Sequence, residues 1–381
     1  MTSQALWIGT YPPAGIGTPP GQGEGVYRVE LDTATGALGD PRRVVETPAP
    51  SFVVRHPAAP VLYVTDESER GAVAAFRVDG DRPESLGAVS SGGAYPCHLL
   101  VDGDRLYAAN YGDGALGVLR LAADGTFASD EPQVLRHTGS GPVADRQGGP
   151  HAHFVAAAPG GHVLVVDLGT DEVRRYGRTS GGLEPVGIAA TLPAGTGARH
   201  LVFRAGFRHD TADERTRFAA SDEGAWFAYL TGELDATVHV LAWDPSTDTG
   251  ELVQTVPAPA CGAWRDPAPA DRPGACGGDL RARWAGDATP APSHLTLDAG
   301  ELVVGVRGVE VLSRFTVGTD GLLTHRVDQP LPARVPRHFA VVGGWTVVAE
   351  QVPGAVTVLD RDGVVASSRA VPSAACVVPA M

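Results

Sequence analysis

The sequence predicts an all-β fold, and three features of the chain support this prediction. Its apolar runs are short, about five to eight residues each, which suits strands and is too short for a helical domain. Glycine and proline, which interrupt helices, are frequent, with 49 and 31 copies in 381 residues. The third feature, internal repetition, predicts how the strands are arranged.

A three-strand pattern recurs along most of the chain. Each copy opens with proline or alanine and then contains a short strand, a tight turn, a second apolar strand, a polar loop and a third strand of alternating pattern. The copies open at Pro50, Pro96, Pro150, Ala198, Pro292 and Pro336. Most neighbouring copies start about 45 residues apart, a spacing typical of propeller blades.

The two ends of the chain supply a seventh copy. Residues 5–12 and 25–32 match the second and third strands, and residues 372–379 match the missing first strand. Pairing strands from both termini closes a ring and removes the exposed sheet edges. We therefore predict one domain over residues 1–381, a seven-bladed β-propeller closed by N- and C-terminal strands.

Two loop insertions account for the longer gap between the copies that open at residues 198 and 292. Residues 204–225 and 257–287 are polar and rich in Pro, Ala and Gly, so we expect no blade of their own there. Cys261 and Cys276 bracket part of the second insertion and could pair if oxidised. Free thiols are favoured for a protein of the cytosol.

Charge and composition exclude several classes of partner. A formal charge of −14 disfavours nucleic acid and anionic membrane surfaces. No apolar run approaches the ~20 residues of a membrane span, and the N-terminus lacks a signal-peptide pattern, so a cytoplasmic location is expected. The four cysteines show no C-x-x-C spacing, and we expect neither a metal nor another cofactor.

All thirty basic residues other than histidine are arginines, because the chain contains no lysine. Schiff-base catalysis and lysine general bases are therefore excluded. An anionic substrate must be held by arginine, histidine or backbone N–H groups, and the arginine fork suits carboxylate and phosphate.

Several motifs point to a known family. Residues 139–153 (GSGPVADRQGGPHAH), 165–171 (VVDLGTD), 195–201 (GTGARHL), 9–12 (GTYP) and 107–118 (YAANYGDGALGV) resemble bacterial seven-bladed propeller lactonases of the 6-phosphogluconolactonase type. These proteins are similar to fungal carboxymuconate-lactonizing enzymes. The resemblance covers nearly the whole chain and implies a hydrolase of sugar lactones without an obligatory metal.

Two repeat positions are expected to meet at one mouth of the channel: the start of strand one and the loop after strand two. In four copies the residue two positions after the opening is a histidine: His98, His200, His294 and His338. This repetition predicts a scaffold role, such as a hydrogen bond between blades. The residue one position after the opening differs from copy to copy, as binding of an asymmetric substrate requires: Ser51, Cys97, His151, Arg199, Ser293, Arg337 and Ser373. Our candidates from this variable set are His151, Arg199 and Arg337.

The loop after strand two contributes the second set: Tyr11, Glu67, Tyr111, Leu168, Glu233, Gly308 and Gln351. His151, Glu233 and Arg307 match positions where the family carries a functional histidine, carboxylate and arginine. Asp167 is expected to cap its own turn through side-chain hydrogen bonds.

Lactone hydrolysis needs an activated water and stabilisation of the charge that develops on the carbonyl oxygen. We assign His151 or Glu233 as the base and Arg199 to the developing charge. Further substrate contacts are expected from a second group of residues: Arg307, Arg337, His153, Glu67, Tyr111 and Gln351. The expected ligand is a small anionic sugar lactone or carboxylate.

Two other functions fit the same residues. A muconate-type lactonizing cycloisomerase would also use arginines, and a non-catalytic ligand-binding propeller would lack a base within reach of the anion. Gly232 stands where the family usually has asparagine, and Pro292 where it often has a second carboxylate. These departures leave the exact substrate open.

Overall fold

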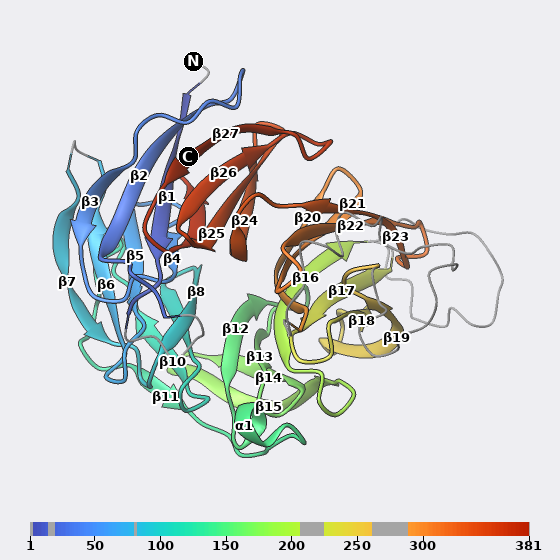
Figure 1. Cartoon of the computed structure of the whole chain (residues 1–381). Helices are drawn as coiled ribbons and strands as arrows, with labels where there is room; N and C mark the ends of the chain where they lie inside the picture. The colour runs from blue at the N-terminus through green and yellow to red at the C-terminus, as the bar shows by residue number, and fades with distance from the viewer. Residues whose placement is uncertain (1–2, 14–19, 80–81, 206–224, 261–288, 381) are drawn as a thin grey trace, which may run out of the picture.

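The computed structural model describes residues 3–13, 20–79, 82–205, 225–260 and 289–380. Within these residues the chain forms seven four-stranded antiparallel sheets, which Figure 1 shows arranged in a ring. The predicted all-β, seven-bladed propeller is confirmed. The helix α1 (Ala144–Gln147) was not predicted; it lies in the loop between the third and fourth blades.

The blades follow one another in chain order, each with its innermost strand named first. The first consists of β28 (Ala374–Pro379), β1 (Ser3–Thr10), β2 (Gly25–Asp32) and β3 (Arg42–Glu46); the second of β4 (Val53–Arg55), β5 (Val61–Asp66), β6 (Ala72–Arg77) and β7 (Glu84–Ser90). The third contains β8 (Pro96–Asp102), β9 (Arg105–Asn110), β10 (Leu116–Arg120) and β11 (Gln133–Leu135); the fourth β12 (Ala152–Ala157), β13 (Val163–Asp167), β14 (Glu172–Thr179) and β15 (Gly182–Thr191). The fifth contains β16 (Ala198–Ala205), β17 (Trp226–Gly232), β18 (Thr237–Asp244) and β19 (Thr249–Pro257). The sixth contains β20 (Ala291–Asp298), β21 (Glu301–Arg307), β22 (Val311–Val317) and β23 (Leu323–Pro330); the seventh β24 (Arg334–Val342), β25 (Trp345–Val352), β26 (Ala355–Leu359) and β27 (Val365–Ala370).

The two ends of the chain close the ring as predicted. Strand β28 pairs antiparallel with β1, from Leu6 opposite Pro379 to Thr10 opposite Ala374. The first blade is thus built from both termini, and β28 also contacts β24 and β4 of the neighbouring blades. Every innermost strand is therefore paired with the second strand of its own blade.

The hydrophobic core of the described residues lies between blades. Each cluster of buried side chains joins two neighbouring sheets, as Phe227 and Tyr229 of the fifth blade pack with Leu302 and Phe315 of the sixth. A smaller cluster around Phe339 joins the sixth and seventh blades. Because every blade contributes to two clusters, each depends on both neighbours for its core.

Residues 206–224 and 261–288 lie outside the described residues, and with them most of both predicted insertions as well as Cys261 and Cys276. The absence of a blade in these insertions stays a prediction. No helix in the described part of the chain is long and apolar enough to cross a membrane.

Candidate active site

Irregular pairing of the innermost strands positions several side chains of the site. In six blades, the register between the innermost strand and its neighbour skips a residue, which is a β-bulge. A bulge re-aims a side chain that regular alternation would place elsewhere. The residues at these irregularities include Cys97, His153, Arg199, Ser293, Arg337 and Ala375.

A cavity of about 190 Å³ opens where these side chains meet the loops that follow the second strands. On the same measure one water needs only about 10–15 Å³, so the cavity has room for a small ligand. Residues of the bulges and loops line the cavity together with a few further aromatic and histidine side chains. The lining residues are Tyr11, Ser51, Phe52, Glu67, Cys97, Tyr111, Arg146, His153, Arg199, His200, Glu233, Arg307, Arg337, His338 and Ala375. The two predicted position sets therefore converge in part, with these members in the cavity wall: Ser51, Cys97, Arg199 and Arg337 of the first set and Tyr11, Glu67, Tyr111 and Glu233 of the second.

His151 does not occupy the repeat position that the opening proline suggested, which lies two residues further on. In the fourth blade Ala152 pairs with Asp167 as Pro96 pairs with Asn110, so His153 is the equivalent of Cys97. His151 does not line the cavity; its Nδ1 lies 2.6 Å from the Tyr111 carbonyl oxygen and its ring stacks on Tyr111.

Pro150 caused this error, because its position mimics the opening proline of the other copies. Pro372 misled in the same way, and Ala375 takes the place predicted for Ser373. His151 and Ser373 each follow one of these prolines and lie two positions before the bulge residue. Ser373 has a positive φ of 47°.

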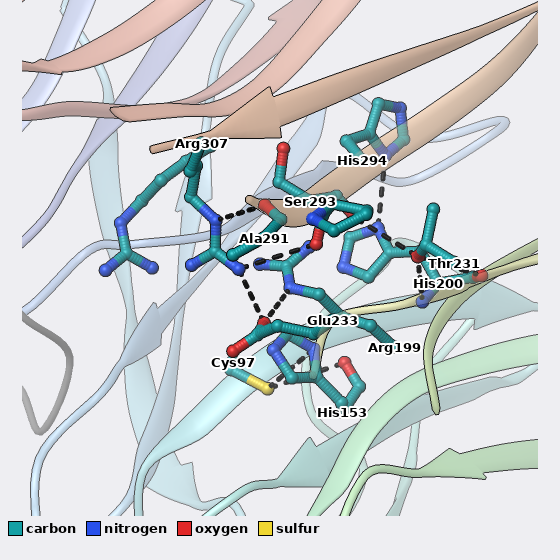
Figure 2. Close-up of polar contacts among 12 residues, drawn as sticks. Cys97, His153, Arg199, His200, Thr231, Glu233, Ala291, Ser293, His294 and Arg307 are labelled. Carbon is teal, nitrogen blue, oxygen red and sulfur yellow. Dashed lines mark hydrogen bonds and ion pairs between the residues drawn. The ribbon is translucent and has the colours of Figure 1, made fainter. Parts of the chain in front are cut away.

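Glu233 forms ion pairs with three of the arginines that line the cavity. Arg199 Nε and Arg307 Nη2 lie 2.9 Å and 2.6 Å from its Oε2, as Figure 2 shows, and Arg146 Nη2 lies 2.7 Å from its Oε1. Burial alone would raise the pKa of this carboxyl, but the three guanidinium groups hold it well below its usual range. Glu233 is therefore ionised at neutral pH.

Arg146 is a cavity residue that the repeat pattern did not predict. It lies in α1, in the loop that leads into the fourth blade, and occupies neither of the two repeat positions. The neighbouring Gln147 is fully buried and donates to the Leu168 carbonyl and to Asp171 Oδ1, at 2.9 Å and 2.8 Å. This anchor holds the loop so that Arg146 reaches both Glu233 and the Tyr111 hydroxyl.

Two glycines set the position of Arg199. Gly195 and Gly197 have φ values of 89° and 65°, which strain other residues, and both N–H groups donate to Asp171. Burial and the neighbouring Arg307 lower the pKa of Arg199 to about 9, which still leaves it charged at neutral pH. Its Nη1 is buried and has no hydrogen-bond partner among the described residues.

Glu67 forms the opposite part of the wall and has a different environment. Its side chain is 6% exposed and hydrogen-bonds to Ser51 and Tyr11. Burial raises the pKa of the carboxyl to about 7, although these hydrogen bonds and the charges of Arg337 and Arg199 act in the opposite direction. The two carboxylates of the cavity thus have pKa values that are pushed apart.

Arg337 is fixed by two contacts that leave its charge available. Its guanidinium carbon lies 3.8 Å from the centre of the Tyr11 ring, and its Nε donates to Gln351 Oε1. Within the described part of the chain no carboxylate lies within ion-pair distance of Arg337. Gln351, predicted to bind substrate, is 1% exposed and does not line the cavity; it orients Arg337 instead.

The repeated histidines connect neighbouring blades, as their predicted scaffold role requires. His98 Nδ1 accepts from the Val155 N–H of the next blade at 3.2 Å, and His200 Nδ1 lies 3.1 Å from His294 Nδ1 across another blade boundary. His338 accepts from the Val377 N–H at 3.4 Å. These hydrogen bonds between blades confirm the prediction, although His200 and His338 also touch the cavity.

His153 lies beside Cys97, with 3.8 Å between the thiol sulfur and Nδ1. Burial and the nearby Arg199 hold the pKa of His153 well below its usual range, so its imidazole is neutral. Burial and the proximity of Glu67 raise the pKa of the Cys97 thiol well above its usual value. Asp167, outside the cavity, caps its turn as predicted, accepting from the Gly169 and Thr170 N–H groups.

Comparison with known proteins identifies the family of this chain. Residues 5–379 match the family described as "Lactonase, 7-bladed beta-propeller". The chain belongs to this lactonase family. A 6-phosphogluconolactonase of Bacillus subtilis is 30% identical over 264 residues, which are 68% of each chain.

Other proteins are similar to this chain over different lengths. An uncharacterized protein of Lactococcus lactis is 30% identical over 61% of this chain, and the match spans 63% of that relative's length. The structure of a periplasmic gluconolactonase of Pseudomonas aeruginosa has a TM-score of 0.79 and 26% identity, with 99% of each chain covered. The cytoplasmic location of this chain stays a prediction.

Proposed function

We propose that this lactonase hydrolyses a sugar lactone that carries an anionic group, such as a phosphate or a carboxylate. The observation that carries the proposal is the charge of the cavity wall. Four arginines line it (Arg146, Arg199, Arg307 and Arg337) against the carboxylates of Glu67 and Glu233. Even with both carboxylates ionised, the positive charges exceed the negative ones by two, so a dianion such as a phosphate monoester is favoured.

The arginines divide into two groups. Arg199 is buried, ion-paired to Glu233 and part of the cavity wall, which suits its positive charge to stabilise the oxygen of the tetrahedral intermediate. Arg337 has no carboxylate partner among the described residues and is held in one orientation, which suits it to the anionic substituent. The names of the Bacillus subtilis and Pseudomonas aeruginosa relatives, a 6-phosphogluconolactonase and a gluconolactonase, support a sugar lactone.

The test is an assay of the purified protein against a panel of 6-phosphogluconolactone, unphosphorylated gluconolactone and a carboxymuconate. We expect ring opening of the phosphorylated lactone above the spontaneous rate. Lactonization of the muconate alone would replace hydrolysis by cycloisomerase activity. A protein that turns over none of these compounds, yet binds the anionic product, would be a ligand-binding propeller.

Replacing Arg337 by Lys is expected to weaken substrate binding more than turnover. An ammonium cannot form the planar two-point contact with phosphate, and a charge-assisted hydrogen bond contributes about 1.5–3 kcal/mol. KM should therefore rise by roughly 10–150-fold, with a much smaller change in kcat. Arg326→Lys, at an exposed ion pair with Glu301 outside the cavity, is the matched control. An unchanged KM in Arg337→Lys would show that the anion binds elsewhere.

A further inference from the structure

The two carboxylates of the cavity have different partners, and this difference assigns them different tasks. Glu233 is held by three arginines, which occupy both of its oxygens. Within the described residues no arginine lies within ion-pair distance of Glu67, whose hydrogen bonds come from the neutral hydroxyls of Ser51 and Tyr11. A carboxylate that is neutralised by three cations accepts a proton poorly.

We propose that Glu67, rather than Glu233 or His151, is the general base that activates water for attack on the lactone carbonyl. The proposal rests on the lactonase function proposed above. Glu67 lies in the wall of the same cavity as Arg199 and the anion-binding Arg337, whereas His151 lies behind Tyr111 and outside the cavity wall. Glu233 then acts as the fixed counter-charge that positions the arginines.

The reaction balances with Glu67 as the only proton carrier. Its carboxylate takes a proton from water while the water oxygen forms a bond to the carbonyl carbon, and the carbonyl oxygen becomes an oxyanion beside Arg199. When the intermediate collapses, the bond between this carbon and the ring oxygen breaks. The protonated Glu67 returns its proton to the departing ring oxygen, which becomes the hydroxyl of the product.

The surroundings of Glu67 support this role. Its charged neighbours are Arg337 and Arg199 on the inner strands of other blades, and its titratable neighbours also include the Cys97 thiol and the Tyr11 hydroxyl. Burial outweighs the two arginines and raises the pKa of Glu67 to about 7, close to the working pH of a general base. The Cys97 thiol, the other nucleophilic group nearby, is protonated because burial raises its pKa.

The experiment combines the pH profile of the wild type with two substitutions at Glu67. The base must be deprotonated, so wild-type kcat/KM for 6-phosphogluconolactone should rise with pH through about 7. Glu67→Gln should lower kcat by roughly 10²–10⁴-fold with little change in KM, and should abolish that rise. Glu67→Asp keeps a carboxylate and should retain part of the activity together with the pH dependence. Glu24→Gln, which removes an exposed carboxylate outside the cavity, is the matched control.

The outcomes separate this proposal from the lactonase function. An active wild type with a Glu67→Gln variant that keeps more than about a tenth of kcat would overturn the role of Glu67 and leave the lactonase function intact. A wild type that hydrolyses no lactone would overturn both. Should Glu67→Gln fail to fold, the wild-type profile decides, since a kcat/KM that is flat between about pH 5.5 and 8 contradicts a base of this pKa.

Discussion

Deleting residues 370–381 is expected to yield an insoluble chain or one without a cooperative unfolding transition. The deletion removes β28, which pairs with β1 along Leu6 to Thr10 and buries Ala374, Ala375, Cys376 and Val377. It leaves the inner edge of the first blade unpaired and opens the cores shared with both neighbouring blades. Soluble yield and thermal unfolding followed by circular dichroism measure the effect.

Deleting Met381 alone is the control, because this residue follows the end of β28 at Pro379. Its removal should leave the melting temperature unchanged. A soluble, cooperatively unfolding chain without residues 370–381 would mean that ring closure by β28 is dispensable.

Replacing Glu233 by Gln is expected to lower the free energy of unfolding by about 3–5 kcal/mol. The substitution leaves three guanidinium groups, one of them fully buried, without their shared counter-charge. Lactone hydrolysis should fall as well, because Arg199 and Arg307 lose the contact that orients them. Glu24→Gln, which breaks an exposed ion pair with Arg43, should cost no more than about 1 kcal/mol.

The pH dependence of this stabilisation follows from the direction of the shift. The pKa of Glu233 is held well below its value in the unfolded chain, so its contribution is present above the unfolded value. The contribution is lost as the pH falls through the folded value. The difference in melting temperature between wild type and Glu233→Gln should therefore shrink on acidification; a difference that is the same at pH 7 and in acid would contradict this account.

The repeat pattern predicted the blades and their closure because each blade carries the same strands and turns. Its errors arose where local residues imitate a repeat signal. Pro150 and Pro372 match the opening proline, but the β-bulges at His153 and Ala375 lie two residues further on. Pairing register depends on contacts with the neighbouring strand, which a search for prolines does not detect.

Site chemistry could be predicted only in part. Glu67, Arg199, Glu233 and Arg307 line the cavity because their repeat positions meet there. Arg146 lies in the loop before the fourth blade and at neither repeat position, so the symmetry argument did not point to it. The contrast between Glu67 and Glu233 depends on which arginines reach which carboxylate, and this depends on side-chain packing between blades far apart in the sequence.

The most direct test of the central claim compares kcat/KM of the wild type for two sugar lactones that differ by one phosphate. The arginine surplus of the cavity predicts that the phosphorylated lactone is preferred by roughly 10–150-fold, the value of one charge-assisted contact. Equal kcat/KM values for the two lactones, or a preference for the uncharged one after subtraction of spontaneous hydrolysis, would contradict the account.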